Sequence, residues 1–394
     1  MRCRKSMSAA LLTAGFVVIL ASGITIHSPN ALAQESQRLV SAPRNPAFLE
    51  YLANRNAGRL RAFSEEGHPL GLVPIPFDMS YLANIPRFRS GTLPTSYDLR
   101  TTGKLTAVRN QGNCGSCWSF ATYGSLESYL KPGETWDFSE NNLIAHSGFD
   151  WGACEGGNNY MSTAYLARWD GPINETDDPY PYTASRATST VRKHVQQVIF
   201  LPERSSATDN DAIKQAVMAY GGVYVSMYWV ESAYNSTTYA YYNSGIQEGG
   251  HAVTVVGWDD NFDKTKFRST PAGNGAFIVK NSWGTSWGQS GFFYASYYDA
   301  FFAREDTPAV FTGDAATNYN AVYQYDPLGA VNQLGYSTGD RTTAWFSNIF
   351  TAVATESLRA VSFYALAPSA SYEIYVYTNV TAGEPRSGTL ASSQ

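Results

Sequence analysis

Residues 110–120 read NQGNCGSCWSF and contain two of the four cysteines of the chain, Cys114 and Cys117. A Cys-x-x-Cys pair can be a redox couple, half of a metal site, or a nucleophile beside a structural cysteine. Each of these chemistries needs different partners elsewhere in the sequence. The rest of the chain therefore decides between them.

The composition indicates a folded protein of more than one domain. The chain has 394 residues, of which 44% are hydrophobic, 14% aromatic and 15% charged. This balance favours a large core over disorder, and the length suits two or three domains. The net charge is −5 and no Lys/Arg-rich patch is present. Nucleic acid is therefore not an expected partner.

The N-terminus has the pattern of an export signal. A basic start, MRCRK, precedes the apolar run AALLTAGFVVILASGI, and Ala31-Leu32-Ala33 provides a small-x-small cleavage site. We predict a signal peptide over residues 1–33 and an exported protein, whether periplasmic, surface-bound or secreted. An uncleaved membrane anchor is the alternative, but the run is short for a bilayer span. No stable membrane span is expected after cleavage.

Export changes the cysteine count. Cys3 would leave with the signal peptide, so that Cys114, Cys117 and Cys154 remain. Three cysteines in an oxidising compartment predict one disulfide and one free thiol.

The segment 34–92 precedes the first clear domain. Residues 46–63 could form an amphipathic helix, and the proline-punctuated residues 68–80 should be extended. We interpret 34–92 as a pro-segment or N-terminal arm. A helix and strap packed permanently on the next domain is an equally acceptable alternative.

Residues 93–306 predict an α+β domain in which helices come first and strands follow. The expected helices are 117–130 and 209–220, the second stopped by Gly221-Gly222. The expected strands are 223–229, 251–258, 275–283 and 291–298. Such segregation favours two halves, one helical and one β-barrel-like, that meet at a cleft.

Residues 318–394 have the texture of an all-β sandwich module. The segments 359–366 and 371–380 alternate with period two and are bounded by Gly, Pro, Ser and Asn. Since Gln394 comes soon after a strand, we expect the module to be truncated here.

The chemistry of Cys117 favours a nucleophile. A zinc site needs about four ligands, but there is no second Cys-x-x-Cys and the five histidines are scattered. A redox dithiol would have its first cysteine at the helix start, whereas here the second one adjoins the helical run. A thiol in the first turn of a helix has its thiolate stabilised by the helix dipole. A neutral imidazole can then take the proton.

The motif CGSCW resembles the signature of papain and the cathepsins. The likeness to papain-like cysteine peptidases extends over roughly residues 93–305. It implies that Cys117 is the nucleophile, Gln111 the oxyanion-hole donor, His251 in GGHAVTVVGW the general base and acid, and Asn281 in VKNSWG the residue that orients the histidine. This resemblance implies a two-lobed fold and no metal or organic cofactor.

Further residues take their expected roles from the same resemblance. It implies a disulfide between Cys114 and Cys154, which lies in ACEGG. Gly156 and Gly157 should offer backbone hydrogen bonds to a substrate strand, and Ala252 should line a substrate pocket. Trp283 should shield the hydrogen bond between histidine and asparagine.

The chain also departs from the papain pattern. Segment 34–92 lacks the long-helix pattern of papain-family propeptides, which argues against inhibition of the usual kind. The module 318–394 is similar to the lectin-like β-domains of some bacterial papain-like peptidases, which implies a carbohydrate ligand; a purely structural sandwich is the alternative. We predict an exported cysteine endopeptidase acting on peptides or proteins. A catalytically vestigial adhesion or carbohydrate-binding protein, and a thiol transpeptidase, are the rival interpretations.

Overall fold

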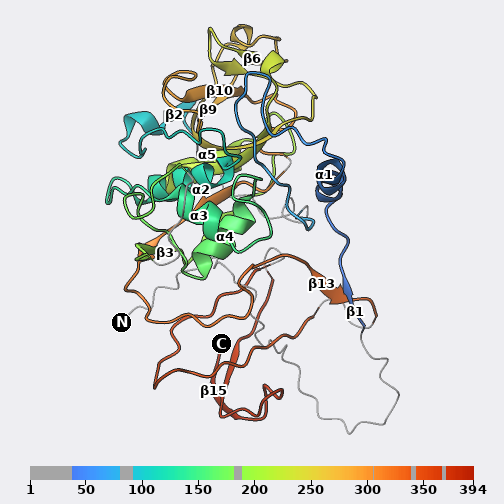
Figure 1. The fold of residues 1–394 in the computed structure, drawn as a ribbon, viewed down its shortest axis with the longest axis vertical. Coiled ribbons are helices and arrows are strands. Elements are labelled where there is room, and N and C mark those ends of the chain that lie inside the picture. The colour runs from blue at the N-terminus through green and yellow to red at the C-terminus, as the bar shows by residue number, and fades with distance from the viewer. Residues whose placement is uncertain (1–37, 80–91, 182–188, 305, 339–342, 366–369) are drawn as a thin grey trace.

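The structure is a computed structural model that describes residues 38–79, 92–181, 189–304, 306–338, 343–365 and 370–394. The predicted signal peptide and its cleavage site lie outside these residues. We call residues 38–79 the arm, 92–315 the central domain and 318–394 the C-terminal module (Figure 1). Across the described ranges, no helix is both long and apolar enough to cross a bilayer.

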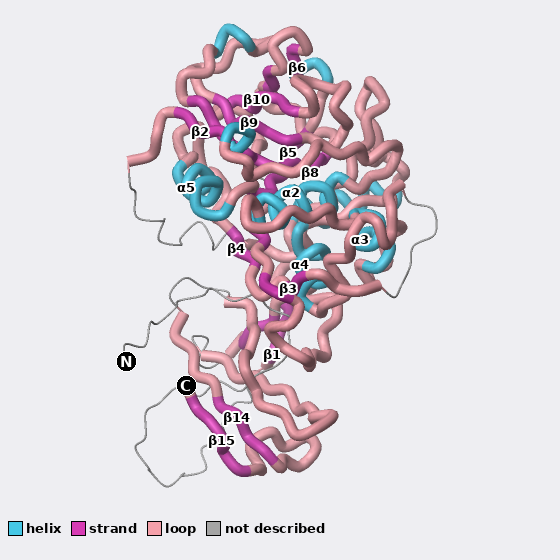
Figure 2. Tube along the Cα trace, turned by 90° about the vertical axis from the view of Figure 1, so that its left-hand side faces the viewer, coloured by secondary structure: helices cyan, strands magenta, loops and turns pink. Residues whose placement is uncertain are grey.

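A large mixed sheet forms one half of the central domain, and its strands are mostly antiparallel (Figure 2). In spatial order they are β4 (Val198–Phe200), β11 (Ala309–Phe311), β5 (Val223–Tyr228), β8 (Gly250–Asp259), β9 (Ala276–Lys280), β10 (Phe292–Ser296), β7 (Ala240–Tyr241) and β6 (Tyr234–Asn235), with β2 (Ser96–Asp98) paired to β8. The ladder between β8 and β9 shifts register at Val255–Gly257. A Cβ on Gly257 would lie 2.3 Å from the Tyr97 carbonyl oxygen, so the close approach of β2 requires glycine there.

The helices form the other half. They are α2 (Cys117–Leu130), α3 (Glu140–His146), α4 (Asn159–Ala167) and α5 (Asp211–Tyr220). Helix α2 is buried on almost every side, because α3, α4 and the sheet surround it. Its Gly124 faces Thr254 of β8 closely enough to leave no room for a Cβ. The predicted α+β class with two halves is confirmed.

The local predictions succeeded where a helix has clear end signals. Helix α5 ends at Gly221, whose φ of 110° stops an α-helix. In the arm, α1 (Pro46–Asn56) is shorter than the predicted helix 46–63, because Gly58 takes a positive φ of 65°. The sequence did not predict α3 and α4.

The C-terminal module has few strands among its described residues. Strand β13 (Leu334–Tyr336) pairs with β1 (Leu39–Ser41) of the arm, and β14 (Tyr375–Thr378) pairs with β15 (Thr389–Ser393). The prediction of a strand at 359–366 was wrong for its described part, residues 359–365. The period-two pattern of these residues would give a strand one apolar face, but no described strand pairs with them.

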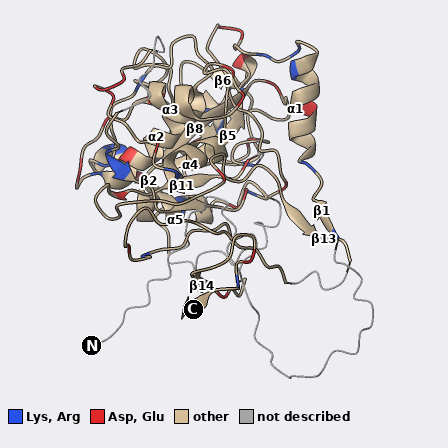
Figure 3. Ribbon diagram, turned by 60° about the horizontal axis from the view of Figure 1, so that its bottom comes forward, with Lys and Arg blue, Asp and Glu red and all other residues tan. Residues whose placement is uncertain are grey.

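Charged residues are distributed without segregation by sign. Figure 3 shows Lys and Arg interspersed with Asp and Glu over the central domain, and both signs on α1. The described charged residues of the central domain therefore do not gather by sign in this view.

Candidate active site

Cys117 is the first residue of α2 and lies where this helix meets strand β8. It is the free cysteine among the described residues and is completely buried. Its Sγ accepts a hydrogen bond from the Ala252 backbone N–H at 3.4 Å. Burial raises the pKa of the thiol to about 11, although nearby backbone N–H groups oppose that rise. In this state the sulfur is a protonated thiol at neutral pH.

His251 stands on β8, one residue before Ala252. Its Nε2 lies 2.8 Å from Oδ1 of Asn281, and the Ser282 backbone N–H donates to the same oxygen at 2.8 Å. Because Oδ1 accepts from Ser282, Nε2 must carry the ring proton and Nδ1 must be the basic nitrogen. Nδ1 is buried and has no hydrogen-bond partner within the described part of the chain. Desolvation lowers the pKa of His251 to about 4.

Trp283 covers this histidine. Its ring stacks on the His251 ring with the centroids 4.7 Å apart, and it is 4% exposed. It follows Asn281, which itself comes directly after β9, so the end of one strand provides both the hydrogen-bond partner and the cover.

Gln111 is fixed beside Cys117 from two sides. Ser282 Oγ donates to its Oε1 at 2.6 Å, which turns Nε2 toward the Cys114 carbonyl at 2.9 Å. The Tyr180 hydroxyl donates to the Gln111 backbone carbonyl at 2.6 Å and lies 2.9 Å from Ser116 Oγ. Sequence reasoning missed Ser282 and Tyr180, although Ser282 lies within the NSW motif.

A disulfide braces the loop before α2. Cys114 and Cys154 are bonded, the pair that the resemblance implied. The Gly115 N–H also donates to the Cys154 carbonyl at 3.2 Å. A Cβ on Gly157 would lie 2.4 Å from the Trp118 ring, so this segment can pass α2 only with glycine at that position.

The arm fills the cleft between the two halves. Leu72 and Gly157 form a parallel bridge, in which the Val73 N–H donates to the Gly157 carbonyl at 2.9 Å and the Gly157 N–H donates to Gly71 at 2.9 Å. On the other wall, the Leu72 N–H donates to the Gly250 carbonyl at 3.1 Å. Leu72 packs in the same apolar cluster as Cys117 and Ala252.

The arm lies directly on the reactive groups. The Gly71 backbone N–H approaches the sulfur and lowers the pKa of Cys117, though less than burial raises it. The Pro69 carbonyl lies 3.4 Å from Gln111 Nε2, and the His68 ring stacks on Trp283 at 4.4 Å. A Cβ on Gly71 would be 2.1 Å from the Gly115 carbonyl oxygen. The sequence had argued against inhibition of the usual propeptide kind, yet residues 68–73 occlude the site.

Helix α1 anchors the arm outside the cleft. The Arg55 guanidinium stacks over Trp151 at 4.0 Å, and Tyr51 meets the same ring edge-on. Arg55 also pairs with Glu155, next to the disulfide. The arm is therefore held at more than the cleft alone.

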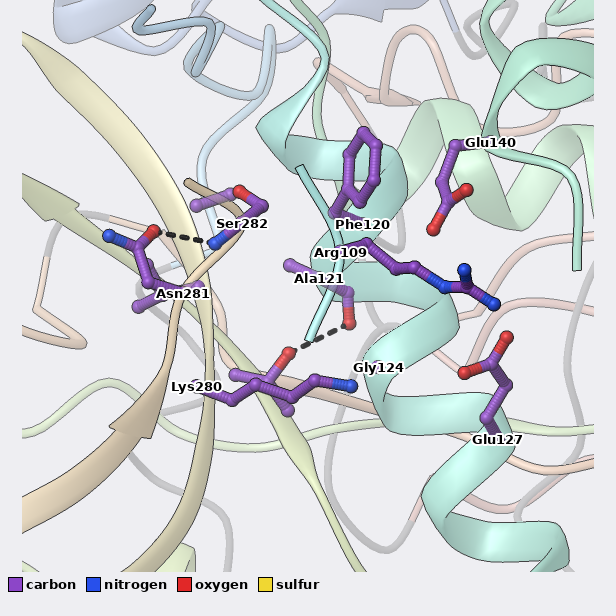
Figure 4. Close-up of a pocket in the computed structure, with 12 residues that line it drawn as sticks. Arg109, Phe120, Ala121, Gly124, Glu127, Glu140, Lys280, Asn281 and Ser282 are labelled. Carbon is purple, nitrogen blue, oxygen red and sulfur yellow. Dashed lines mark hydrogen bonds between the residues drawn. The ribbon is translucent and has the colours of Figure 1, made fainter. Parts of the chain in front are cut away.

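Charged residues line a small cavity next to Asn281, where α2 meets the sheet (Figure 4). Lys280 points across the interface between the halves, where its Nζ donates to Thr106 Oγ1 at 3.2 Å, and Thr106 donates to Glu127 of α2. Burial raises the pKa of Glu127 and lowers that of Lys280. The cavity among them measures ≈ 20 Å³, room for about one water molecule. Nothing in the sequence pattern had indicated this group.

The structure thus brings together the residues that were singled out in the sequence. One cleft contains Cys117, His251, Asn281, Gln111, Trp283, Ala252, Gly156 and Gly157. A thiol at a helix start, an imidazole with a free ring nitrogen and an orienting amide define a cysteine-nucleophile site between two lobes.

Comparison with known proteins agrees with this class of site. A model of the papain family cysteine proteases matches residues 93–301, and a model of lectin-like domains matches residues 322–394. The chain belongs to the papain family of cysteine proteases, with a lectin-like domain following the peptidase domain.

Two curated relatives match about half of the chain. The chain is 33% identical over 214 residues to the senescence-specific cysteine protease SAG12 of Arabidopsis thaliana, covering 52% of this chain and 56% of that protein. It is 34% identical over 214 residues to cathepsin K of Mus musculus, covering 51% of this chain and 59% of that protein. The chain therefore spans less than two thirds of the length of these relatives.

Among solved structures, one similar protein has both domains. It is the cysteine protease and lectin-like domains of Cwp84, a surface layer associated protein of Clostridium difficile, with a TM-score of 0.63 and 27% identity, covering 76% of this chain and 66% of that one. A variant of clostridial Cwp84 after propeptide cleavage gives a TM-score of 0.50 and 31% identity, covering 55% of this chain and 56% of that one.

Proposed function

We propose that the chain is the latent precursor of an exported cysteine endopeptidase whose nucleophile is Cys117. The observation on which this rests is the geometry of the imidazole: Asn281 fixes the protonated Nε2 of His251 and leaves Nδ1 as the base, while the N–H of the next residue, Ala252, donates to the Cys117 sulfur. Membership of the papain family supports the same reaction class. The predicted signal peptide supports export, as does the surface-layer association stated for Cwp84.

Each residue has a defined part in the reaction. His251 takes the Cys117 proton on Nδ1, and the sulfur attacks the carbonyl carbon of the scissile peptide bond. The oxyanion that forms is stabilised by Gln111 Nε2 and the Cys117 N–H, each donor contributing about 3 kcal/mol. The imidazolium then protonates the leaving amine. Water hydrolyses the thioester, which releases the acid and restores the thiol.

The arm accounts for latency, and we assign residues 34–92 as the pro-segment. The Pro69 carbonyl lies near Gln111 Nε2, in the region that the substrate oxygen would occupy. The backbone groups of Gly157 and the carbonyl of Gly250, which would hydrogen-bond to a substrate strand, are hydrogen-bonded to the arm. Burial under the arm keeps both the thiol and the imidazole neutral, so the reactive ion pair does not form at neutral pH.

The decisive experiment labels the thiol of the arm-free protein. Intact mass is measured after incubation with an epoxysuccinyl thiol inhibitor, and cleavage of a denatured protein is measured in parallel. Wild type should take one adduct and cleave the substrate. Cys117→Ser should do neither, and His251→Ala should lose cleavage. His194→Ala is the matched control, because His194 is a buried histidine outside the cleft.

The outcomes separate the alternatives. A folded, reduced, arm-free wild type that takes no adduct and cleaves nothing would contradict the proposal and favour a vestigial binding protein. A product joined to an added amine, in place of a free acid, would identify transpeptidation. Adduct on Cys117→Ser would show that another residue reacts.

A further inference from the structure

The arm contacts the C-terminal module as well as the cleft. Strand β1 pairs antiparallel with β13, so that Val40 stands opposite Gly335. The pairing continues beyond the strands, because the Ala42 N–H donates to the Gln333 carbonyl at 2.8 Å and the Ser337 N–H donates to the Arg38 carbonyl at 3.0 Å. The module therefore uses the arm as the neighbour of one of its strands.

A second contact lies between the cleft and β1 along the arm. Ile75, Phe77 and Met79 form a buried apolar cluster with Tyr160 of α4, and Ala330 and Tyr364 of the module pack against it. Phe77 meets Tyr160 edge-on at 4.9 Å, and Tyr160 stacks with Tyr364 at 6.3 Å. The arm thus contributes three of the four buried side chains of this cluster, which lies where the two domains meet.

Within the described residues, direct contacts between the two domains are the stacking of Tyr160 on Tyr364 and polar bonds near the start of the module. Strand β12 (Asp314–Ala315) is the last element of the central domain and pairs there with β3 (Lys193–His194), just before the module begins. His194 Nδ1 lies 2.6 Å from Asn318 Oδ1, and Arg168 donates to the Pro327 carbonyl at 2.7 Å. Among the described residues, strand β13 pairs with β1 of the arm and with no other strand.

We propose that residues 38–42 and 75–79 of the arm form the surface that fastens the C-terminal module to the central domain. Only residue 74 separates this surface from the segment 69–73 in the cleft. One polypeptide segment therefore covers the Cys117 thiol and also holds the module against the central domain. Removal of the arm would expose the thiol and release the module. The link to activation rests on the proposed function, whereas the fastening itself does not.

The physical consequence of arm removal follows from what it covers. Without β1, strand β13 presents an unpaired edge, and the cluster against which Tyr364 and Ala330 pack loses Ile75, Phe77 and Met79 and keeps Tyr160. The contacts that remain between the domains are the stacking of Tyr160 on Tyr364 and a few polar bonds near the start of the module. Domains joined by so small an interface move relative to one another by default.

The test disrupts the β1 end of the arm and leaves the segment in the cleft unchanged, in a chain that cannot cleave itself. In a Cys117→Ala background, Val40→Pro places proline, which cannot donate a hydrogen bond, in the middle of the β1–β13 pairing. Val40→Thr is the matched control, because threonine keeps the β-branched shape and the backbone N–H. Hydrogen exchange at residues 333–337 and the maximum dimension from small-angle X-ray scattering are measured for each.

Val40→Pro should speed exchange at residues 333–337 by about tenfold or more and increase the maximum dimension, whereas Val40→Thr should match the parent. A form freed of its arm, by cleavage at a specific protease site inserted within residues 80–91, should scatter like Val40→Pro. Unchanged exchange and dimension in both forms would overturn the proposal.

Thiol labelling keeps the two proposals distinguishable. In the chain with native Cys117, Val40→Pro should leave the thiol unreactive, because residues 69–73 still fill the cleft. Gly71→Val, whose side chain collides with Gly115, should expose it. If neither arm removal nor Gly71→Val makes Cys117 reactive, the proposed function fails, and the scattering result still decides the fastening.

Discussion

The centre of the main sheet and the C-terminal hairpin are both made of strands, yet they differ in what covers them. In β8 every residue except the two at its ends is buried, whereas all five residues of β15 are exposed. Helix α2 packs on β8 from one side and α5 contributes to the apolar cluster on the other. The hairpin β14–β15 has no such layers among the described residues.

This difference explains where chemistry can be placed. His251 and Ala252 keep fixed positions because β8 pairs with three strands, β5, β9 and β2, and packs against helices. The module takes its position from contacts outside itself, chiefly those with the arm. A rigid site and a movable module therefore coexist in one chain.

The largest expected effect is on the reactivity of the Cys117 thiol, compared with and without the arm. At pH 7 a thiol with a pKa of about 11 is thiolate in only about 1 part in 10⁴. Since the pKa is raised, the neutral form persists until pH approaches 11, and iodoacetamide should label the intact chain only at high pH. Removing the arm re-solvates Cys117 and His251, so labelling at pH 7 should become about 10³-fold faster or more.

Labelling is followed by intact mass across pH 5 to pH 11, with Cys117→Ser as the blank. A single pH profile shared by the intact and arm-free forms would mean that the arm does not close the site.

The second effect compares stability in the two regions directly. Phe293→Ala removes a fully buried ring from the core of the sheet and should lower the free energy of unfolding by about 3–5 kcal/mol. Leu390→Ala, in β15, changes a side chain that is 48% exposed and should stay within about 0.5 kcal/mol of wild type. Urea unfolding measures both. Equal losses would show that the module packs as tightly as the sheet.

The smallest effect concerns a single hydroxyl in the active site. Tyr180→Phe removes the bond to the Gln111 carbonyl and loosens the oxyanion donor, so kcat of the arm-free enzyme should fall about tenfold with little change in KM. Iodoacetamide labelling, which forms no oxyanion, should keep its rate. Tyr325→Phe removes a similar bond in the module and is the control. A parallel loss of labelling would indicate general damage and not positioning.

The site was predictable because its residues lie in short, distinctive motifs. Cys117 and Gln111 share one motif, His251 lies in β8 and Asn281 comes directly after β9, and the apolar texture of both strands is visible in the sequence. The helix start at Cys117 and the stop at Gly221 follow from local rules. Such rules work where a residue's neighbours in sequence are also its neighbours in space.

Contacts between distant segments could not be predicted. The sequence marked residues 68–80 as extended but gave no sign that Gly71 would lie against Gly115, since that contact depends on the path of the whole arm. Lys280 and Glu127 are far apart in the sequence and are linked by hydrogen bonds through Thr106. No periodic pattern in the sequence indicates such a contact between buried charged residues. The strand predicted at residues 359–365 was wrong because alternation is a local property of the sequence, whereas a strand also needs a neighbouring strand with which to pair.

The burial of Cys117 beneath the arm has a chemical consequence beyond inhibition. A free thiol near a disulfide is at risk in an oxidising environment, because a solvated thiolate is readily converted to sulfenic and then to irreversible sulfinic acid. Beneath Gly71 the sulfur is neutral and shielded from dissolved oxidants. While it is in place, the arm masks the reactive sulfur as a protecting group does in synthesis, and under the proposed function its removal exposes that atom.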